Sequence, residues 1–354
     1  MKLFNCPACG NIVYFENRAC AACRSHLAYS PRATAMITWK DAPPRLCTNA
    51  AHQACTWIVD DHEEFCRACR HNGTVPDLSS AERMAGWQEL EDAKHKLFYS
   101  LLRWKLPLRT RAEDPEHGLI FHFLADDPST SAKVMTGHAN GVITIALAEA
   151  DAIERERRRL EMGEPYRTLL GHFRHEVGHH YWDLLVRDGG QLDACRVLFG
   201  DDREDYAEAL RAHYEHGAPS DWHAHFVSAY ATTHPWEDFA ETWAHYLHIV
   251  DTLEMASEFG MQVKPSLDRL GGLSAAIDFD PYIAEDFEKI ANAWFPFVFA
   301  MNSVNRAMGV SDLYPFILSP TVLRKLGFIH GLVQRTASMA PATRRAGVAG
   351  ARLG

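Results

Sequence analysis

The stretch His175-Glu176-Val177-Gly178-His179 decides how this 354-residue chain is interpreted. On an α-helix, residues four apart are separated by about 40° around the axis, so the two histidine rings project from one side, a turn apart. Two neutral imidazoles held in this way supply half of a tetrahedral zinc site, and Glu176 is placed to take a proton from metal-bound water. The pentapeptide therefore predicts a helix that carries a catalytic zinc site.

The residues around this motif predict that its helix is amphipathic. On a helical wheel, four apolar side chains fall within about 40° of the face opposite His175. They are Leu170, Phe173, Val177 and Leu184. The alternative, a buried helix with satisfied core histidines, would not place the apolar stripe opposite both rings. We expect this helix to begin at Glu164-Pro165.

A catalytic zinc needs a third protein ligand and an open fourth position. Glu237 and Glu241 lie four apart on a predicted helix over residues 235–259, which Pro235 can start because its missing N–H costs nothing in the first turn. One carboxylate can bind zinc while the other accepts the N–H of a ligand histidine. We predict Glu237 as the ligand and Glu241 as the supporting carboxylate, with the reverse order and His234 as open alternatives.

Eight of the nine cysteines lie within the first 69 residues, and their spacing is typical of metal ligands. The first quartet has the compact zinc-ribbon spacing C-x2-C-x10-C-x2-C. It consists of Cys6, Cys9, Cys20 and Cys23. The second quartet has a looser spacing and consists of Cys47, Cys55, Cys66 and Cys69. We predict one structural zinc in each quartet, with a crossed pairing between the quartets left open.

Disulfide bonds are the competing explanation for these cysteines. A reducing cytoplasm keeps thiols free, and C-x-x-C is a metal or redox spacing. A segment this short also has too little core to fold without its metals. The cysteines therefore favour a zinc-ribbon module, whose surface could also bind a partner protein.

The two motifs beyond the cysteines resemble a known family. H-E-x-x-H followed by E-x-F-A-E, here Glu237 to Glu241, is similar to the gluzincin metallopeptidases and specifically to the anthrax lethal factor group. The resemblance implies that Glu237 binds zinc and that Tyr230, seven residues before it, assists catalysis. Tyr230 would donate a hydrogen bond to the oxyanion of the tetrahedral intermediate. A merely packed aromatic side chain is the alternative for Tyr230.

A longer part of the chain resembles a bacterial family of zinc-ribbon, zinc-binding metallopeptidases. The similarity runs from the cysteine-rich start, through residues 166–175, to His245-Tyr-Leu-His248, and so covers nearly the whole length. It implies structural zinc sites ahead of a metallopeptidase domain. It implies little about the substrate.

Composition narrows the classes of function. The chain carries 36 basic and 46 acidic residues, a net charge of −10, which argues against a dedicated nucleic-acid binder or a membrane-surface protein. We find no apolar stretch near the roughly 20 residues that cross a bilayer. The start runs directly into Cys6 without the apolar core of a signal peptide. We therefore expect a cytoplasmic protein that does not bind a membrane.

Residue patterns predict an α+β, mostly helical zincin-like domain with a small sheet. Further helices are expected at 81–104, 148–162, 280–308 and 320–335, and strands at 119–124 and 142–147. Asn140-Gly141 is a strong turn signal before the second strand. That strand is our candidate for the exposed edge to which a substrate peptide adds, with an ordinary core strand as the alternative.

Three segments follow from these patterns. We predict a zinc-ribbon module with two four-cysteine zinc sites at 1–75, a zincin-like metallopeptidase domain at 76–335, and a disordered basic tail at 336–354. The predicted function is a zinc-dependent peptidase with one catalytic and two structural zinc ions, acting on a peptide or protein. One alternative is a catalytically silent scaffold that binds a partner through its ribbons. Another is a protease tethered to nucleic acid, against which the net acidity counts.

Overall fold

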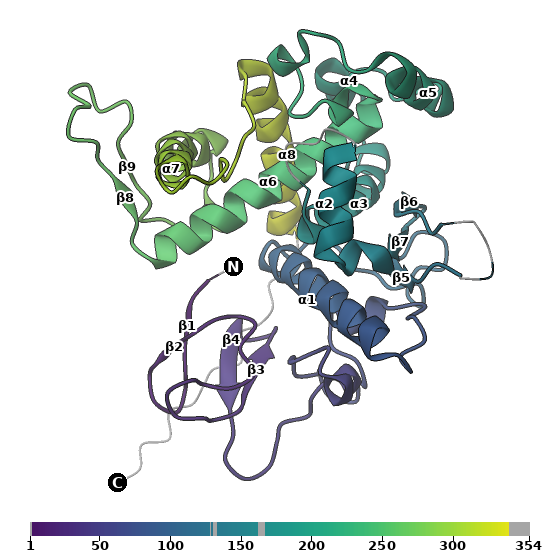
Figure 1. Ribbon diagram of the computed structural model, residues 1–354, viewed down its shortest axis with the longest axis vertical. Coiled ribbons are helices and arrows are strands. Elements are labelled where there is room, and N and C mark those ends of the chain that lie inside the picture. The colour runs from purple at the N-terminus through teal and green to yellow at the C-terminus, as the bar shows by residue number, and fades with distance from the viewer. Residues whose placement is uncertain (1, 128, 130–132, 162–166, 340–354) are drawn as a thin grey trace.

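The helix that carries His175 and His179 packs across a long central helix, as the computed structural model shows (Figure 1). The motif helix is α3 (Leu169–Tyr181), and the central helix is α6 (Pro235–Glu258). The structure describes residues 2–127, 129, 133–161 and 167–339. The fold in this part of the chain is mostly helical with small sheets, as the sequence predicted.

Helix α3 begins with a side-chain cap. The Oγ1 atom of Thr168 accepts a hydrogen bond from the backbone N–H of Gly171 at 3.0 Å, which satisfies one of the free N–H groups of the first turn. The predicted start at Glu164-Pro165 lies outside the described residues, and the helix itself begins at Leu169. At its other end α3 passes into a π-helical turn, Trp182–Arg187.

Helix α6 agrees with its predicted bounds to within one residue. His234 caps it, because the Nδ1 atom of its ring accepts the backbone N–H of Trp236 at 3.1 Å. Pro235 follows in the first turn, where no N–H is needed. The capped start places Glu237 in the first turn, facing α3.

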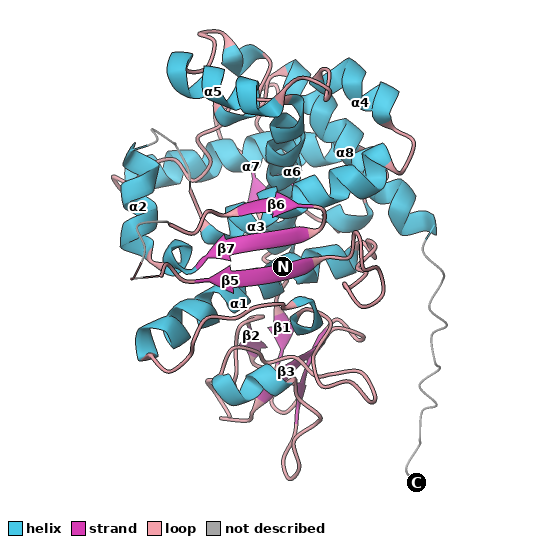
Figure 2. Ribbon diagram, turned by 90° about the vertical axis from the view of Figure 1, so that its right-hand side faces the viewer, coloured by secondary structure: helices cyan, strands magenta, loops and turns pink. Residues whose placement is uncertain are grey.

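The sheet has three strands, in the order β5-β7-β6 (Figure 2). They are β5 (Ile120–Leu124), β6 (Gly137–Ala139) and β7 (Val142–Ala146). Asn140 and Gly141 both have positive φ, at 48° and 78°, as a tight hairpin between β6 and β7 requires. The prediction that the 142–147 strand is the exposed edge was wrong. Sequence patterns missed the short strand β6, which pairs with β7 and takes that position.

The cysteine-rich segment forms a separate lobe beside helix α1 (Ala81–Arg103), with its short strands in purple in Figure 1. Its strands are β1 (Phe4–Asn5), β2 (Ile12–Val13), β3 (Leu27–Ser30) and β4 (Ala35–Thr38), paired as β1-β2 and β3-β4. Phe15 makes edge contacts with Tyr29 and Trp57 of this lobe and with Tyr99 of α1, at ring-centroid distances of 4.9, 6.0 and 5.5 Å. The lobe therefore shares an aromatic core with the helical part.

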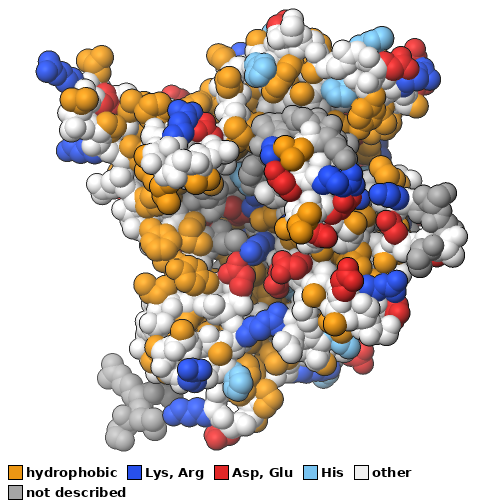
Figure 3. Space-filling model, in the orientation of Figure 1, with side chains coloured by type: hydrophobic (Ala, Val, Ile, Leu, Met, Phe, Trp, Pro, Cys, Tyr) orange, Lys and Arg blue, Asp and Glu red, His pale blue; other side chains and the backbone are white. Residues whose placement is uncertain are grey.

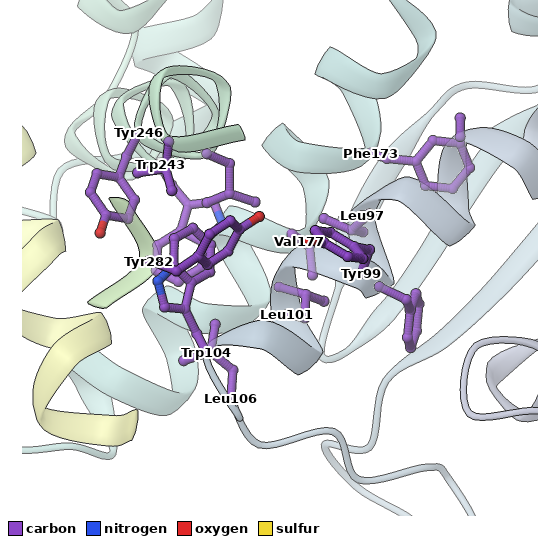
Figure 4. Close-up of a cluster of buried hydrophobic side chains, with 14 of the residues drawn as sticks. Leu97, Tyr99, Leu101, Trp104, Leu106, Phe173, Val177, Trp243, Tyr246 and Tyr282 are labelled. Carbon is purple, nitrogen blue, oxygen red and sulfur yellow. The ribbon is translucent and has the colours of Figure 1, made fainter. Parts of the chain in front are cut away.

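The main core lies where α1, α3 and α6 meet (Figure 4). It combines Leu97 and Leu101 of α1 with Val177 of α3 and Trp243 of α6, all of them fully buried. Burying one such side chain contributes roughly 1.5–3 kcal/mol. Phe173 and Val177 point into the core, as the predicted apolar face of the motif helix requires.

The remaining helices surround this centre. They are α2 (Ala152–Glu161), α4 (Leu192–Phe199), α5 (Tyr206–His216), α7 (Phe287–Ala307) and α8 (Pro320–Met339), and a hairpin of β8 (Gln262–Val263) and β9 (Ala275–Ala276) projects beside α7. On the face shown in Figure 3, side chains of both charges gather over α2, where i,i+3 and i,i+4 ion pairs form. None of the helices in the described part of the chain combines the length and apolar character that crossing a bilayer requires.

Two predicted bounds need correction at the C-terminal end. The helix expected from residue 280 begins at Phe287, because Asp286 caps it and a short 3-10 turn, Pro281–Ile283, precedes it. The tail expected from residue 336 is wrong for residues 336–339, which belong to α8. The rest of the predicted tail, 340–354, lies outside the described residues.

Candidate metal centre

Three potential ligand atoms meet where α3 crosses α6. The Nε2 atoms of His175 and His179 are 3.2 Å apart. The Oε2 atom of Glu237 lies 3.0 Å from the first of these nitrogens and 3.5 Å from the second. The structure thus brings together the three residues expected to bind the catalytic ion, and we call this group the α3–α6 site.

The proton of His175 is placed by a second carboxylate. Its Nδ1 atom is 2.7 Å from the Oε1 atom of Glu241, and a carboxylate only accepts hydrogen bonds, so Nδ1–H is the donor. This leaves Nε2 as the nitrogen that can bind a metal ion in the α3–α6 site. The other oxygen of Glu241 accepts a hydrogen bond from the Ser228 hydroxyl at 2.6 Å. Burial raises the pKa of Glu241, but the hydrogen bond to His175 outweighs it and lowers the pKa to about 2, so this carboxylate stays charged.

The three donors fit a zinc ion. Zinc–ligand bonds of about 2.0–2.2 Å place neighbouring ligands of a tetrahedral ion about 3.3 Å apart. The Oε2 atom of Glu237 is buried and, within the described residues, has no hydrogen-bond partner of good geometry. A metal ion between this buried carboxylate oxygen and the two ring nitrogens would satisfy all three atoms. The donor set and its spacing are those that zinc prefers.

Tyr206 supports Glu237 from outside the site. Its hydroxyl, at the start of α5, donates a hydrogen bond to the Oε1 atom of Glu237 at 2.7 Å. This leaves Oε2 as the oxygen that faces the two histidines. Sequence reasoning did not single out Tyr206, because it lies 31 residues before Glu237 and belongs to no motif.

The rival ligand His234 is engaged elsewhere. Its Nδ1 atom caps α6, and its Nε2 atom lies 3.1 Å from the backbone carbonyl oxygen of Glu204. Both ring nitrogens therefore have backbone partners. His234 positions Glu237 by starting the helix and does not join the three donors.

Gly178 allows the two helices to approach each other. A Cβ atom at this position would lie 3.0 Å from the Cα atom of Ala240 and 3.2 Å from the Cβ atom of Trp243. The first of these is a backbone atom that cannot move alone. The small residue inside the motif is thus required by the contact with α6, which brings Glu237 within reach of the histidines.

Aromatic rings flank His179. The ring centroids of Trp236 and His179 are 3.7 Å apart. On strand β6, the His138 ring stacks on the His179 ring at a centroid distance of 5.9 Å. His138 is itself anchored, since its Nε2 atom accepts the backbone N–H of Gly141 at 2.9 Å. No spacing in the sequence pointed to His138 or Trp236. The edge strand β6 therefore runs beside the site.

Glu176 lies next to the donors but is not one of them. It is only 8% exposed. Burial raises the pKa of its carboxyl to about 7, and the charge of His175 opposes that rise. A cation in the α3–α6 site would lower this pKa below that value. A group with a pKa near neutrality can both accept and release a proton at physiological pH.

Tyr230 stands on the other side of His175. It begins a 3-10 turn, Tyr230–Thr232, and its ring lies 5.9 Å from the His175 ring. Burial raises the pKa of its hydroxyl above the usual range, so it stays protonated and can donate a hydrogen bond. Its hydroxyl also interacts with that of Tyr206. The structure places Tyr230 at the rim of the site.

The cysteines form two unmixed groups. In each quartet the four sulfur atoms lie within 4.8 Å of one another, and all nine cysteines of the chain are free thiols. In the first quartet, the Cys6–Cys23 and Cys9–Cys20 sulfur distances are both 3.7 Å. Sulfurs about 3.7 Å apart match a tetrahedral zinc with bonds of about 2.3 Å. The two quartets support the predicted pair of four-cysteine zinc sites without crossed pairing.

Comparison with known proteins agrees with this geometry. Residues 83–332 match the protein family described as "Putative zinc-binding metallo-peptidase". The chain belongs to this family. Residues 3–80 match a zinc-ribbon domain. The α3–α6 site falls within the first match, and both cysteine quartets fall within the second.

Relatives of the chain occur in mycobacteria. The chain is 42% identical over 341 residues to "Uncharacterized protein Rv2568c" of Mycobacterium tuberculosis (strain ATCC 25618 / H37Rv), covering 95% of this chain and 96% of the relative. "Uncharacterized protein Mb2598c" of Mycobacterium bovis shows the same identity and coverage. No solved structure matches the chain significantly. The resemblance to the lethal factor group therefore stays a prediction.

Proposed function

We propose that the chain is a zinc-dependent peptidase that hydrolyses peptide bonds with Glu176 as the general base. One observation supports this above the others. The donors of His175, His179 and Glu237 converge at 3.0–3.5 Å with the Nε2 atom of His175 turned inward. Three protein ligands leave one position of a tetrahedral ion open, which is the mark of a catalytic zinc.

Each residue has a distinct role in this proposal. His175, His179 and Glu237 would hold the ion, and Glu241 would orient His175. When bound, zinc polarises the scissile carbonyl and lowers the pKa of a coordinated water. Glu176 accepts the proton of the attacking water and delivers it to the leaving amine. The Tyr230 hydroxyl donates a hydrogen bond to the developing oxyanion.

Strand β6 offers a place for the substrate backbone. It pairs with β7 on one side, and it is the last strand in the order β5-β7-β6. His138 of this strand stacks on His179, so the free edge runs beside the proposed ligands. An extended peptide can add to such an edge through backbone hydrogen bonds. We infer a peptide or protein substrate, and a reducing compartment such as the cytoplasm, in keeping with nine free thiols.

Glu176→Gln tests the proposed function. The substitution removes the base and keeps the shape and all three ligands, so we expect unchanged zinc content and loss of peptidase activity by orders of magnitude. Hydrolysis is measured with casein and with a quenched fluorescent peptide library. The zinc content of the protein is measured by elemental mass spectrometry. The matched control is Glu82→Gln on the exposed start of α1, which should keep full activity.

Three outcomes distinguish the alternatives. Activity in the native protein that Glu176→Gln abolishes without loss of zinc supports the proposal. A zinc-loaded native protein with no hydrolysis of any library member favours the silent scaffold. Loss of zinc in Glu176→Gln would show that this carboxylate is a ligand and not the base.

A further inference from the structure

A histidine from the helical part of the chain faces the second cysteine quartet. His95 lies on α1 and is almost completely buried. Its Nε2 atom is 3.3 Å from the sulfur of Cys55, 3.6 Å from that of Cys69 and 3.9 Å from that of Cys66. These three contacts come from 26 to 40 residues away in the sequence, and no spacing rule connects His95 to the cysteines.

The other nitrogen of His95 shows which way the ring is protonated. Its Nδ1 atom lies 2.6 Å from the backbone carbonyl oxygen of Glu91, one turn earlier on α1. A carbonyl oxygen only accepts hydrogen bonds, so Nδ1 carries a proton, and Nε2 is the nitrogen that faces the sulfurs and can bind a metal. Zinc-binding histidines commonly have this arrangement, with one nitrogen on the metal and the other donating to a carbonyl or carboxylate.

The position of Nε2 is defined by simple geometry. An atom that touches three corners of a tetrahedron lies over the face opposite the fourth corner. Here the face is made by Cys55, Cys66 and Cys69, and the fourth corner is Cys47, whose sulfur lies within 4.8 Å of all three. His95 and Cys47 therefore lie on opposite sides of one triangle of sulfurs.

A zinc ion can bind that triangle from either side. The sulfurs of Cys55 and Cys66 are 3.7 Å apart. For an equilateral triangle with this side and bonds of about 2.3 Å, the ion lies roughly 0.8 Å above or below the plane. On one side Cys47 completes the tetrahedron. On the other side Nε2 of His95 lies about 2 Å from the ion, which is an ordinary zinc–nitrogen bond length.

Glu91 is a second potential ligand beside this quartet, but its carboxylate already has other partners. One carboxylate oxygen lies 2.7 Å from the Nζ atom of Lys94, and the other accepts a hydrogen bond from Asn72 at 2.6 Å. Both Glu91 and Lys94 have fully buried side chains. The Oε2 atom of this carboxylate also lies 3.6 Å from the sulfur of Cys69. The ion pair with Lys94 nevertheless accounts for the carboxylate without a metal, so His95 is the candidate fifth donor.

We propose that His95 is a reserve ligand of the second cysteine zinc, able to replace Cys47 as the fourth donor. The ion then stays bound when the Cys47 thiolate is lost, held by three cysteines of the lobe and by α1. Because α1 also packs on α3, this zinc joins the cysteine-rich lobe to the helix that carries the α3–α6 site. Within the described residues, no histidine joins the first quartet in the same way.

Single and double substitutions in the full chain test the reserve ligand. We expect Cys47→Ala to keep the zinc content of the native protein, and Cys47→Ala with His95→Ala to lose one equivalent. Cys69→Ala and the matched first-quartet variant Cys9→Ala should each lose one equivalent, since neither has a substitute. In the cobalt-substituted protein, Cys47→Ala should lose about a quarter of the thiolate-to-cobalt absorption of that site while retaining a tetrahedral spectrum.

The proposal is overturned if soluble Cys47→Ala loses one zinc as Cys69→Ala does. A second measurement covers the case in which Cys47→Ala does not fold. Zinc release to a chelator is followed in the native protein and in His95→Gln, whose amide can still donate a hydrogen bond to sulfur but binds zinc poorly. We expect at least tenfold faster release of one zinc in His95→Gln, and equal rates would overturn the proposal. Neither readout depends on peptidase activity.

Discussion

The cysteine-rich lobe and the α3–α6 site both gather metal ligands, but they do so in opposite ways. In the lobe, each quartet comes from one short segment, and every donor of the tetrahedron is a protein sulfur. In the α3–α6 site the ligands come from two helices. Glu237 of α6 lies 58 residues after His179 and 62 residues after His175 of α3. Among the described residues, three donors converge there. A closed tetrahedron stabilises a fold, whereas an open one leaves a position for chemistry.

The residues that surround the two kinds of site also differ. Beside the second quartet, Glu91 is satisfied by Lys94 and Asn72, and His95 is the reserve donor that we propose. Around the α3–α6 site, Glu176 and Tyr230 are held close to the donors without being used to bind them. A buried carboxyl whose pKa is raised, as that of Glu176 is, is typical of a catalytic site. The comparison therefore separates the structural metals from the proposed catalytic one.

The largest expected effect is loss of one metal from one region alone. Glu237→Ala should empty the α3–α6 site, because two histidines supply only half of a tetrahedral shell. Both quartets should keep their ions, so the chain should lose one zinc and all peptidase activity. The total zinc content measures the loss of one ion. The thiolate absorption of the cobalt-substituted protein should stay unchanged, because both quartets keep their ions.

The reciprocal control for this prediction is Cys20→Ala. It should remove one zinc and thiolate absorption from the lobe, while the α3–α6 site keeps its ion. If Glu241→Ala empties the α3–α6 site and Glu237→Ala does not, the two carboxylates have been assigned in the wrong order.

A smaller effect should follow from Tyr230→Phe, which sharpens the distinction between binding and chemistry. The substitution removes one hydrogen bond to the developing oxyanion and no ligand, so zinc content should be unchanged. We expect kcat to fall about 10²–10³-fold, the size of one lost oxyanion donor. Steady-state kinetics on the best library peptide measures this. Tyr14→Phe, on an exposed tyrosine of the lobe, is the control, and full activity in Tyr230→Phe would contradict the assigned role.

The smallest effect is expected for Glu241, which touches a ligand but not the ion. Glu241→Ala removes the acceptor of the His175 Nδ1–H, and losses of this kind typically cost about 10–100-fold in metal affinity or activity. Glu241→Gln keeps an acceptor oxygen and should lose less. Competition with a zinc-binding dye measures the affinity. Native affinity in Glu241→Ala would show that the orientation of His175 depends on packing alone.

Local pattern predicted much of this molecule because the decisive residues follow local rules. The four-residue spacing of His175 and His179 requires a common helix face, and the structure has that face turned toward α6. Paired C-x-x-C knuckles bring the sulfurs together over short loops. The bounds of α1 and α6 were predicted to within one residue, because Ser80 and His234-Pro235 mark their starts.

Errors arose where a longer-range contact decides the outcome. Strand β6 is too short to show an alternating pattern, so the sheet edge was assigned to its neighbour β7. The basic character of the C-terminal residues suggested an early end, but α8 continues to Met339. No local pattern could place Tyr206 on Glu237 or His138 on His179, since each pair is brought together only by folding.

The sequence by itself determined the kind of chemistry: two helix-borne histidines, a glutamate between them and two sets of four thiolates, each recognisable because helix geometry and knuckle loops act over a few residues. The tertiary structure decided how these parts are completed. It selected Glu237 for the three donors, turned Glu241 to His175 and His234 to the helix cap, and brought His95 to the second quartet. These choices depend on how α1, α3 and α6 cross, and a crossing is set by packing between distant segments.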